Sequence, residues 1–166
     1  MAGTPLSRRS LLFGRTAAPG PRPPWSMPED LFAARCTGCD ACIRACPERV
    51  LSRAPDGLPQ FDPHTGSGEC TFCGDCVQAC GTRALDAARP RPWTLRADVG
   101  DGCLPAAGIV CASCREVCPE QAITVPPGGR GPARVDADRC TGCGACVAVC
   151  PGSALALSPH VLEACA

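Results

Sequence analysis

The chain of 166 residues has few of the large side chains that build an apolar core, since it contains four Phe, two Trp and no Tyr. Its hydrophobic content is 45%, but much of that is Ala and Cys, and 18 Gly and 19 Pro divide the chain into short segments. This composition argues against a large apolar core. Seventeen cysteines make disulfides or metal the candidates for stabilising the fold instead.

Lysine and long apolar runs are also absent. All sixteen basic residues are Arg, and residues 1–35 carry five of them against Glu29 and Asp30, so a basic arm precedes a mildly acidic body. This imbalance is small, and no aromatic residues alternate with the basic ones, so we expect no nucleic-acid partner. No apolar run approaches the length of a membrane span, so we expect no transmembrane segment.

Cysteines recur in four groups, and only Cys165 is left over. Three groups have the spacing C-x2-C-x2-C-x3-C, whereas in the third group of the chain the first gap is seven residues. In chain order the groups are Cys36, Cys39, Cys42 and Cys46; Cys70, Cys73, Cys76 and Cys80; Cys103, Cys111, Cys114 and Cys118; and Cys140, Cys143, Cys146 and Cys150. The regular spacing is typical of bacterial ferredoxins, in which three thiolates of one motif bind one iron-sulfur cluster and the fourth binds its neighbour.

Disulfides and zinc are the alternatives to iron-sulfur clusters. Cysteines spaced this closely would each need a distant disulfide partner, and four such groups would form an implausibly tangled framework. A structural zinc site usually takes two C-x2-C pairs, so a third cysteine at the same interval is surplus to it. We therefore predict [4Fe-4S] clusters, and we expect Cys165 to be a free thiol and His64 and His160 to be solvated.

The segments between the cysteine groups predict the fold class and the pairing of the groups. Residues 50–62 and 122–136 each contain two short apolar runs around a Pro/Gly turn, which predicts a hairpin. We therefore pair the first group with the second and the third with the fourth, which predicts an α+β fold of tandem bacterial-ferredoxin-like modules. The expected organisation is a basic, Pro-rich arm (1–30), a first half (31–88), a linker (89–102), a second half (103–158) and a tail (159–166).

Exchange of the fourth ligand within each pair predicts four sets of cluster ligands. The sets are Cys36, Cys39, Cys42 and Cys80; Cys70, Cys73, Cys76 and Cys46; Cys140, Cys143, Cys146 and Cys118; and Cys103, Cys111, Cys114 and Cys150. In the last set, the seven residues after Cys103 must form a loop that returns its thiolate to the site. A labile or three-iron cluster, or a bystander role for Cys103, remains open, so we expect three [4Fe-4S] clusters and leave a fourth open.

Clusters of this type exchange single electrons. The sequence has no phosphate-binding glycine loop, no dinucleotide fingerprint and no arrangement of Ser, His and Asp typical of a hydrolase. We therefore expect an electron-carrying protein that is not an enzyme, and we expect its folding to depend on cluster loading.

The N-terminal stretch SRRSLLFGR starts like a twin-arginine export signal, but Gly14 and Arg15 end its apolar part after three residues. Two interpretations remain: an unstructured basic arm without a role, or an arm kept in the mature protein for docking to a partner through Arg8 and Arg9. Both predict a cytoplasmic protein, and that compartment suits free thiols.

The chain resembles the NapF family, the ferredoxin-type accessory proteins of the periplasmic nitrate reductase system. The resemblance is carried by Ser7-Arg8-Arg9 with Leu12 and Gly14-Arg15, by Arg22-Pro23-Pro24-Trp25, by Arg91-Pro92-Trp93 before Gly102-Cys103, and by the order of the cysteine groups. The family is described with three ferredoxin-type modules, which matches the three regular groups and leaves the Cys103 group open.

The resemblance implies a cytoplasmic iron-sulfur protein that contacts the precursor of the catalytic subunit of periplasmic nitrate reductase. It would assist maturation of that subunit before export, by a role such as cluster loading. The cysteine motifs suit an alternative equally well: an electron-transfer polyferredoxin that is a subunit of, or a shuttle to, a dehydrogenase or reductase. A structural zinc protein is a third alternative, and it would be colourless.

Overall fold

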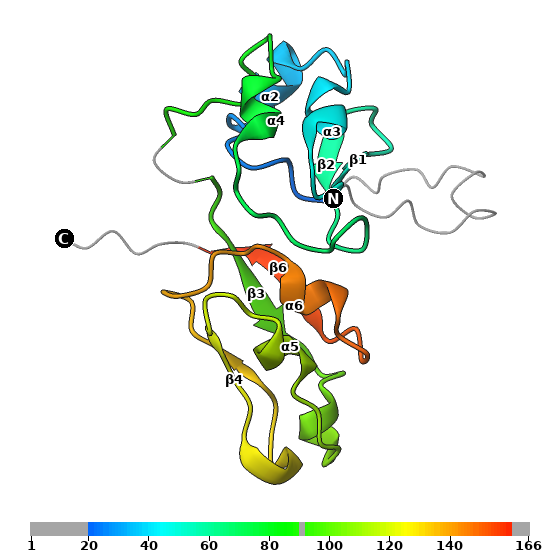
Figure 1. Ribbon diagram of the computed structural model, residues 1–166, viewed down its shortest axis with the longest axis vertical. Helices are drawn as coiled ribbons and strands as arrows, with labels where there is room; N and C mark the ends of the chain where they lie inside the picture. The colour runs from blue at the N-terminus through cyan, green and yellow to red at the C-terminus, as the bar shows by residue number, and fades with distance from the viewer. Residues whose placement is uncertain (1–19, 90–91, 161–166) are drawn as a thin grey trace, which may run out of the picture.

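The computed structural model describes residues 20–89 and 92–160, which form an upper lobe (20–89) and a lower lobe (92–160) of short helices and strands, stacked along the long axis (Figure 1). The helical segments are α2 (Glu29–Arg35), α3 (Ala41–Ala45), α4 (Asp75–Gln78), α5 (Ser113–Glu116) and α6 (Ala145–Ala148), with the 3-10 turns η1 (Leu104–Ala107) and η2 (Pro127–Gly129). The strands are β1 (Leu51–Arg53), β2 (Pro59–Phe61), β3 (Leu95–Val99), β4 (Ile123–Thr124), β5 (Arg134–Val135) and β6 (Leu155–Pro159). No helix in the described part of the chain is long and apolar enough to cross a membrane.

Both predicted hairpins are present, and the predicted α+β fold of ferredoxin-like modules is confirmed. β1 pairs with β2 in antiparallel fashion, and β4 pairs with β5 in the same way. The β1–β2 turn includes Gly57, whose φ of 84° is readily adopted only by residues without a Cβ. Each hairpin connects two successive cysteine groups, as the apolar runs and Pro/Gly turns of residues 50–62 and 122–136 predict.

The segment 89–102, for which the sequence predicts a linker, contains strand β3 instead. β3 pairs with β6 in antiparallel register from Leu95 opposite Pro159 to Val99 opposite Leu155. Leu95 and Ala97 are buried in this two-stranded sheet. β3 thus lies within the segment predicted as a linker, and the partner that makes it a strand lies about sixty residues further along the chain.

The segment just before α2 also packs on the upper lobe, although the sequence predicts an arm up to residue 30. Pro23 and Pro24 are buried, and Ser26 forms a β-bridge with Leu85. The Arg22 guanidinium pairs with Glu29 at 2.6 Å and with Asp56 at 2.5 Å. These contacts join the start of the described chain to the β1–β2 hairpin.

The three regular cysteine groups share one backbone pattern. In each group the residue just before the second cysteine and the residue just after it both have positive φ. They are Gly38 and Asp40, Phe72 and Gly74, and Gly142 and Gly144, with φ between 54° and 95°. Left-handed residues on both sides of the second cysteine turn the chain sharply, so that successive thiols converge on one side of the loop.

The turn after the fourth cysteine is the same in all four groups. The residue three positions after that cysteine has positive φ, and its N–H donates a hydrogen bond of 3.1 to 3.3 Å to the carbonyl of the cysteine. These residues are Arg49, Arg83, Gln121 and Ser153. The next residue is buried in every case. The third group, which has the irregular spacing, therefore keeps the turn that the other groups have.

Each lobe has a small core in which cysteines take part. The upper core contains Phe32, Phe61 and Leu85 together with Cys42 and Cys76. The lower core contains Ile123, Val147 and Leu155 together with Cys103 and Cys146. These cores agree with the scarcity of large apolar residues in the sequence.

Candidate metal centres

Four cavities in the structure are each lined by four cysteines. The sets are Cys36, Cys39, Cys42 and Cys80 (site I); Cys46, Cys70, Cys73 and Cys76 (site II); Cys118, Cys140, Cys143 and Cys146 (site III); and Cys103, Cys111, Cys114 and Cys150 (site IV). These are the four sets that exchange of the fourth ligand predicts. The four cavities are similar in size, so they suit four occupants of one kind.

Short helices distribute the cysteines of one motif between two sites. In the upper lobe, α3 carries Cys42 of site I and is followed directly by Cys46 of site II. α4 carries Cys76 of site II, and Cys80 of site I lies two residues beyond its end. In the lower lobe, α5 and α6 relate sites III and IV in the same manner. Because each helix spans about one turn, the third and fourth cysteines lie on adjacent turns and face neighbouring cavities.

The donor set fits iron-sulfur clusters. Every cysteine in the described part of the chain is a free thiol, which contradicts a disulfide scaffold. Among residues 20–89 and 92–160, no group of three or more His, Cys, Asp or Glu side chains is close enough to hold a single metal ion. The thiols of each site are therefore not placed to hold one zinc ion together, whereas thiolates around a shared cavity can bind the irons of a cluster.

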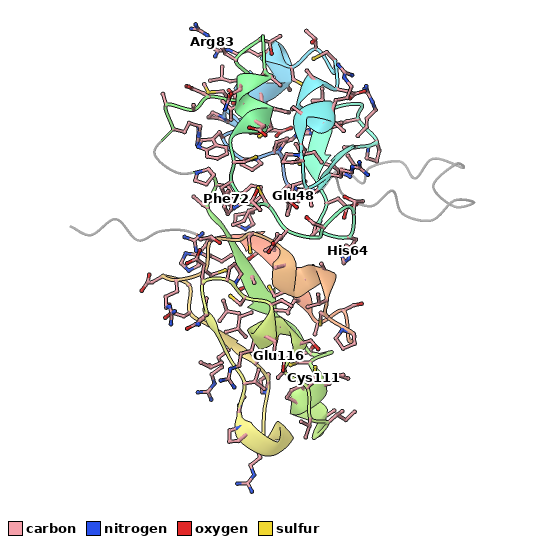
Figure 2. The ribbon with its side chains drawn as sticks, viewed as in Figure 1. Glu48, His64, Phe72, Arg83, Cys111 and Glu116 are labelled. Atoms are coloured by element: carbon pink, nitrogen blue, oxygen red, sulfur yellow. The ribbon has the colours of Figure 1, made fainter. Side chains whose placement is uncertain are left out.

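The irregular third group also reaches its cavity. After Cys103 the chain forms η1 and turns at Gly108, whose φ is 80°, and returns to Cys111 in the lower lobe (Figure 2). Cys103 is buried, and its Sγ accepts a hydrogen bond of 3.4 Å from the N–H of Ala133. The structure thus brings Cys103 together with Cys111, Cys114 and Cys150. Its role as a ligand stays a prediction.

Burial makes several of these thiols hard to ionise without a metal. Burial raises the pKa of Cys42 to about 11, and it raises the pKa of Cys70, Cys76 and Cys146 to about 12. The pKa of Cys39, an exposed thiol, is lowered instead by a hydrogen bond from the backbone of Ala41. Because the thiolate is the ligand, a bound cluster would have to displace the protons of the buried thiols.

Backbone N–H groups also point at sulfur. The N–H of Ala122 donates to Cys118 Sγ at 3.3 Å, and the N–H of Ala154 donates to Cys150 Sγ at the same distance. Both bonds belong to the turn that follows the fourth cysteine. Hydrogen bonds to the sulfurs of a cluster stabilise its reduced form, so these turns would tune reduction potential as well as geometry.

Cysteine spacing gives no indication of the residues that cover the sites. Trp25 and Phe72 line site II, with their ring centroids 6.4 Å apart. Ala97 of β3 lines site III, and Val99 of β3 lines site IV. A signal for β3 was present, because apolar residues alternate in LRADV, the sequence of residues 95–99.

The two histidines do not line any of the four sites. His64 and His160 are exposed, as predicted. Arg8, Arg9 and Cys165 lie outside the described residues.

The fold and the four cysteine sites define a ferredoxin-type iron-sulfur protein. Two sequence profiles, each described as a 4Fe-4S dicluster domain, match residues 26–85 and residues 109–154. [4Fe-4S] clusters are therefore its cofactors. The second match begins after Cys103, so it covers seven of the eight lower-lobe cysteines.

Relatives cover most of the chain. It is 40% identical over 153 residues to the "Ferredoxin-type protein NapF" of Escherichia coli strain K12, which covers 90% of this chain and 92% of that protein. It is 41% identical to the protein of the same name from Haemophilus influenzae, over 84% of this chain and 79% of that protein. It is also 36% identical to the "Methylamine utilization ferredoxin-type protein MauM" of Methylorubrum extorquens, over 90% of this chain and 76% of that protein. The chain belongs to the NapF family of ferredoxin-type proteins.

Proposed function

We propose that this protein is a cytoplasmic accessory protein that assists maturation of the catalytic subunit of periplasmic nitrate reductase before that subunit is exported. Cluster loading is the form of assistance that the sites suit best. The observation that supports this proposal most strongly is the 40% identity to a NapF protein over nearly the full length of both chains. The basic arm supports the proposal, because Arg8 and Arg9 stand in a twin-arginine-like stretch without a full export signal.

We also propose that all four sites hold [4Fe-4S] clusters. The support is that site IV has the same donor set and a similar cavity volume as the regular sites. Iron and acid-labile sulfide per chain, measured on anaerobically purified protein, test the number. About sixteen iron atoms are expected, four for each cluster. About twelve would mean that site IV is vacant, and a protein with zinc and almost no iron would refute the cluster assignment.

Copurification tests whether the protein binds the precursor of the nitrate reductase catalytic subunit. The tagged protein, expressed in its source organism, is expected to capture the precursor form of the nitrate reductase catalytic subunit from the cytoplasmic fraction. Replacing both Arg8 and Arg9 with Ala should weaken the capture and leave the absorbance spectrum unchanged. Capture of only the mature periplasmic subunit, or equal capture by the double variant, would contradict the proposed docking.

A second candidate function is electron transfer as a polyferredoxin. The observation that favours it is the similarity over 90% of the chain to a MauM protein, a ferredoxin-type protein named for methylamine utilization and not for nitrate reductase. A strain without this protein separates the two functions. Maturation predicts that the catalytic subunit isolated from the periplasm of that strain has lost cluster iron. Electron supply predicts a fully loaded subunit that turns over normally with an artificial electron donor.

A further inference from the structure

The ligand loops of sites II and III touch each other, although they belong to different lobes. The backbone N–H of Cys70, a site II cysteine, donates a hydrogen bond of 2.8 Å to the carbonyl of Cys143, a site III cysteine. The bonded groups belong to the cysteines themselves, so no other residue separates the two loops at this point. Two clusters bound at these sites would therefore be neighbours across the lobe boundary.

Trp93 joins the same two loops from the side. Its Nε1–H donates a hydrogen bond of 2.9 Å to the carbonyl of Thr141 in the site III loop. Its ring packs edge-on against Phe72 of the site II loop, with the ring centroids 5.5 Å apart. Phe72 lies near the boundary between the lobes (Figure 2). A single indole thus contacts both loops and fixes their separation.

Glycines allow this close approach. A Cβ at Gly144, the residue just before α6, would lie 2.8 Å from the ring of Phe61 and 3.0 Å from Pro63 in the upper lobe. A Cβ at Gly68 would lie 2.5 Å from the Cβ of Ala148 in the lower lobe. Such distances are shorter than packed carbon atoms tolerate, so both positions bring the lobes together only as glycine. The contact between the lobes is therefore a packed interface and not a flexible connection.

We propose that sites II and III form a direct electron-transfer junction, so that the protein is one continuous chain of four clusters in the order I, II, III, IV. The proposal rests on the proposed occupancy of the sites. Clusters held by the cysteines of sites II and III would exchange one electron, so that one cluster would be oxidised and its neighbour reduced by one electron, with no proton or covalent bond exchanged. An electron that enters at one lobe can therefore leave at the other.

The ends of this chain lie in different lobes. Site I includes Cys39, which is exposed in the upper lobe. Site IV lies in the lower lobe, where the loop between Cys103 and Cys111 exposes Ile109 and Val110. Electron donor and electron acceptor could thus bind at separate surfaces.

The test uses full-length variants that keep one cluster in each lobe. Replacing Cys39 and Cys111 with Ala empties sites I and IV and leaves sites II and III. The matched control replaces Cys73 and Cys111 with Ala, which empties sites II and IV and leaves sites I and III. About eight iron atoms per chain identify preparations with two clusters, and the EPR spectrum of the oxidised protein reports any three-iron cluster that remains.

EPR spectra of the two dithionite-reduced variants decide the question. The variant with sites II and III is expected to give a broadened, split signal from two interacting spins, and the control is expected to give the sum of two isolated signals. If both variants hold two clusters and both give isolated signals, the proposal of a direct junction is wrong. The iron count shows whether both remaining sites hold a cluster. A low iron count therefore indicates a vacant site, whereas a full iron count with isolated signals indicates that the junction is absent.

A second comparison can be made if the variant that keeps sites II and III does not bind its two clusters. Replacing Cys39 and Cys73 with Ala leaves only the lower lobe loaded, and replacing Cys111 and Cys143 leaves only the upper lobe loaded. If the junction is direct, the EPR signal of the reduced four-cluster protein should be broader than the sum of the EPR spectra of these two variants. A four-cluster spectrum equal to that sum would refute the proposal.

Discussion

Arg96 is a buried charge in strand β3, with 6% of its surface exposed. Its Nε donates to the carbonyl of Ala137 and its Nη1 to the carbonyl of Leu95, each at 2.7 Å. It makes no ion pair within residues 20–89 and 92–160. Both carbonyls lie beside the ligand loop of site III: Ala137 is three residues before its first cysteine, and Leu95 packs against Gly142.

A buried cation without a carboxylate partner is costly unless a neighbouring negative charge compensates it. A [4Fe-4S] cluster with four thiolates is anionic and becomes more so when reduced, so Arg96 should favour the reduced form at site III. Arg96→Met is expected to lower one midpoint potential by on the order of 50 mV, equivalent to roughly 1 kcal/mol for one electron. A redox titration followed by EPR measures the midpoint potential of each cluster.

The exposed Arg134 on β5 offers the matched control, because water screens its charge. Arg134→Met should leave all four potentials unchanged. Equal potentials in the Arg96→Met variant and the wild-type protein, at equal iron content, would show that Arg96 is too far from the cluster to matter.

Phe72 is a bulky residue in a left-handed conformation, with φ of 54°. The corresponding positions of two other groups are Gly38 and Gly142. A side chain in this region costs roughly 1–2 kcal/mol. The ring offsets that cost by packing against Trp25 and Trp93 and by lining site II.

We expect Phe72→Gly to relieve the strain and still destabilise the protein by about 2 kcal/mol, because the lost burial and two lost aromatic pairs together exceed the strain. The cavity of site II also loses its cover. The measurement is the rate at which the absorbance of the clusters decays in air, and one cluster should decay several-fold faster than in the wild-type protein. An unchanged decay rate would mean that the ring does not shield site II.

The short elements differ in how well the sequence predicts them. The hairpins β1–β2 and β4–β5 are local, since a turn with Pro and Gly separates two runs that pair with each other, and both could be predicted. β3 could not be placed in the same way. Its alternation in residues 95–99 is a strand signal, but nothing near it in the sequence indicates β6 as its partner. Long-range pairing of this kind depends on packing across the whole lobe.

Asp98→Pro tests the role of β3 in holding the lower sites. The N–H of Gly100 bonds to the carbonyl of Ala154, and the N–H of His160 bonds to the carbonyl of Thr94. Because hydrogen-bonded pairs alternate along antiparallel strands, the N–H of Asp98 must also be in the ladder. Proline removes that donor from the strand, and the loss of such a hydrogen bond costs roughly 1–3 kcal/mol.

The expected result is loss of iron from sites III and IV, because β3 lines both of them. Iron per chain should fall from about sixteen to about eight atoms. Asp98→Asn is the matched control, since it retains the N–H and an oxygen that can accept the hydrogen bond from Ser158. A variant Asp98→Pro with full iron content would show that the lobe folds around its cysteines without this sheet.

Across both lobes, spacing predicted which cysteines share a cavity, but it could not predict how the lobes meet. The rule that a fourth cysteine serves the neighbouring site needs only the order of the motifs. The contact between Cys70 and Cys143 needs Trp93 and two glycines from separate segments to pack together. Similarly, the length of the gap after Cys103 could not indicate whether that thiol returns to site IV, because the path depends on η1 and on the turn at Gly108.

Four cavities lined by cysteines take the place of much of the apolar core, so the fold as a whole should depend on its clusters. Anaerobic removal of iron with a chelator is expected to unfold both lobes, because binding free energy at such sites is folding free energy. Circular dichroism and gel filtration would show the loss of secondary structure and compactness. A compact protein without iron would mean that the small cores are sufficient.

Reloading the iron-free protein with iron and sulfide should then depend on pH in a defined direction. Every ligand must lose its proton, and the cysteines are protonated at neutral pH both in the unfolded chain, where their pKa is about 8.5, and in the folded chain, where burial raises the pKa of Cys70, Cys76 and Cys146 to about 12. Cluster loading therefore releases protons throughout the neutral range and becomes more favourable as the pH rises. Iron bound per chain after anaerobic reconstitution should increase from mildly acidic to mildly alkaline buffer. Equal loading across that range would indicate that the cysteines are already ionised before iron binds, contrary to the burial of these thiols.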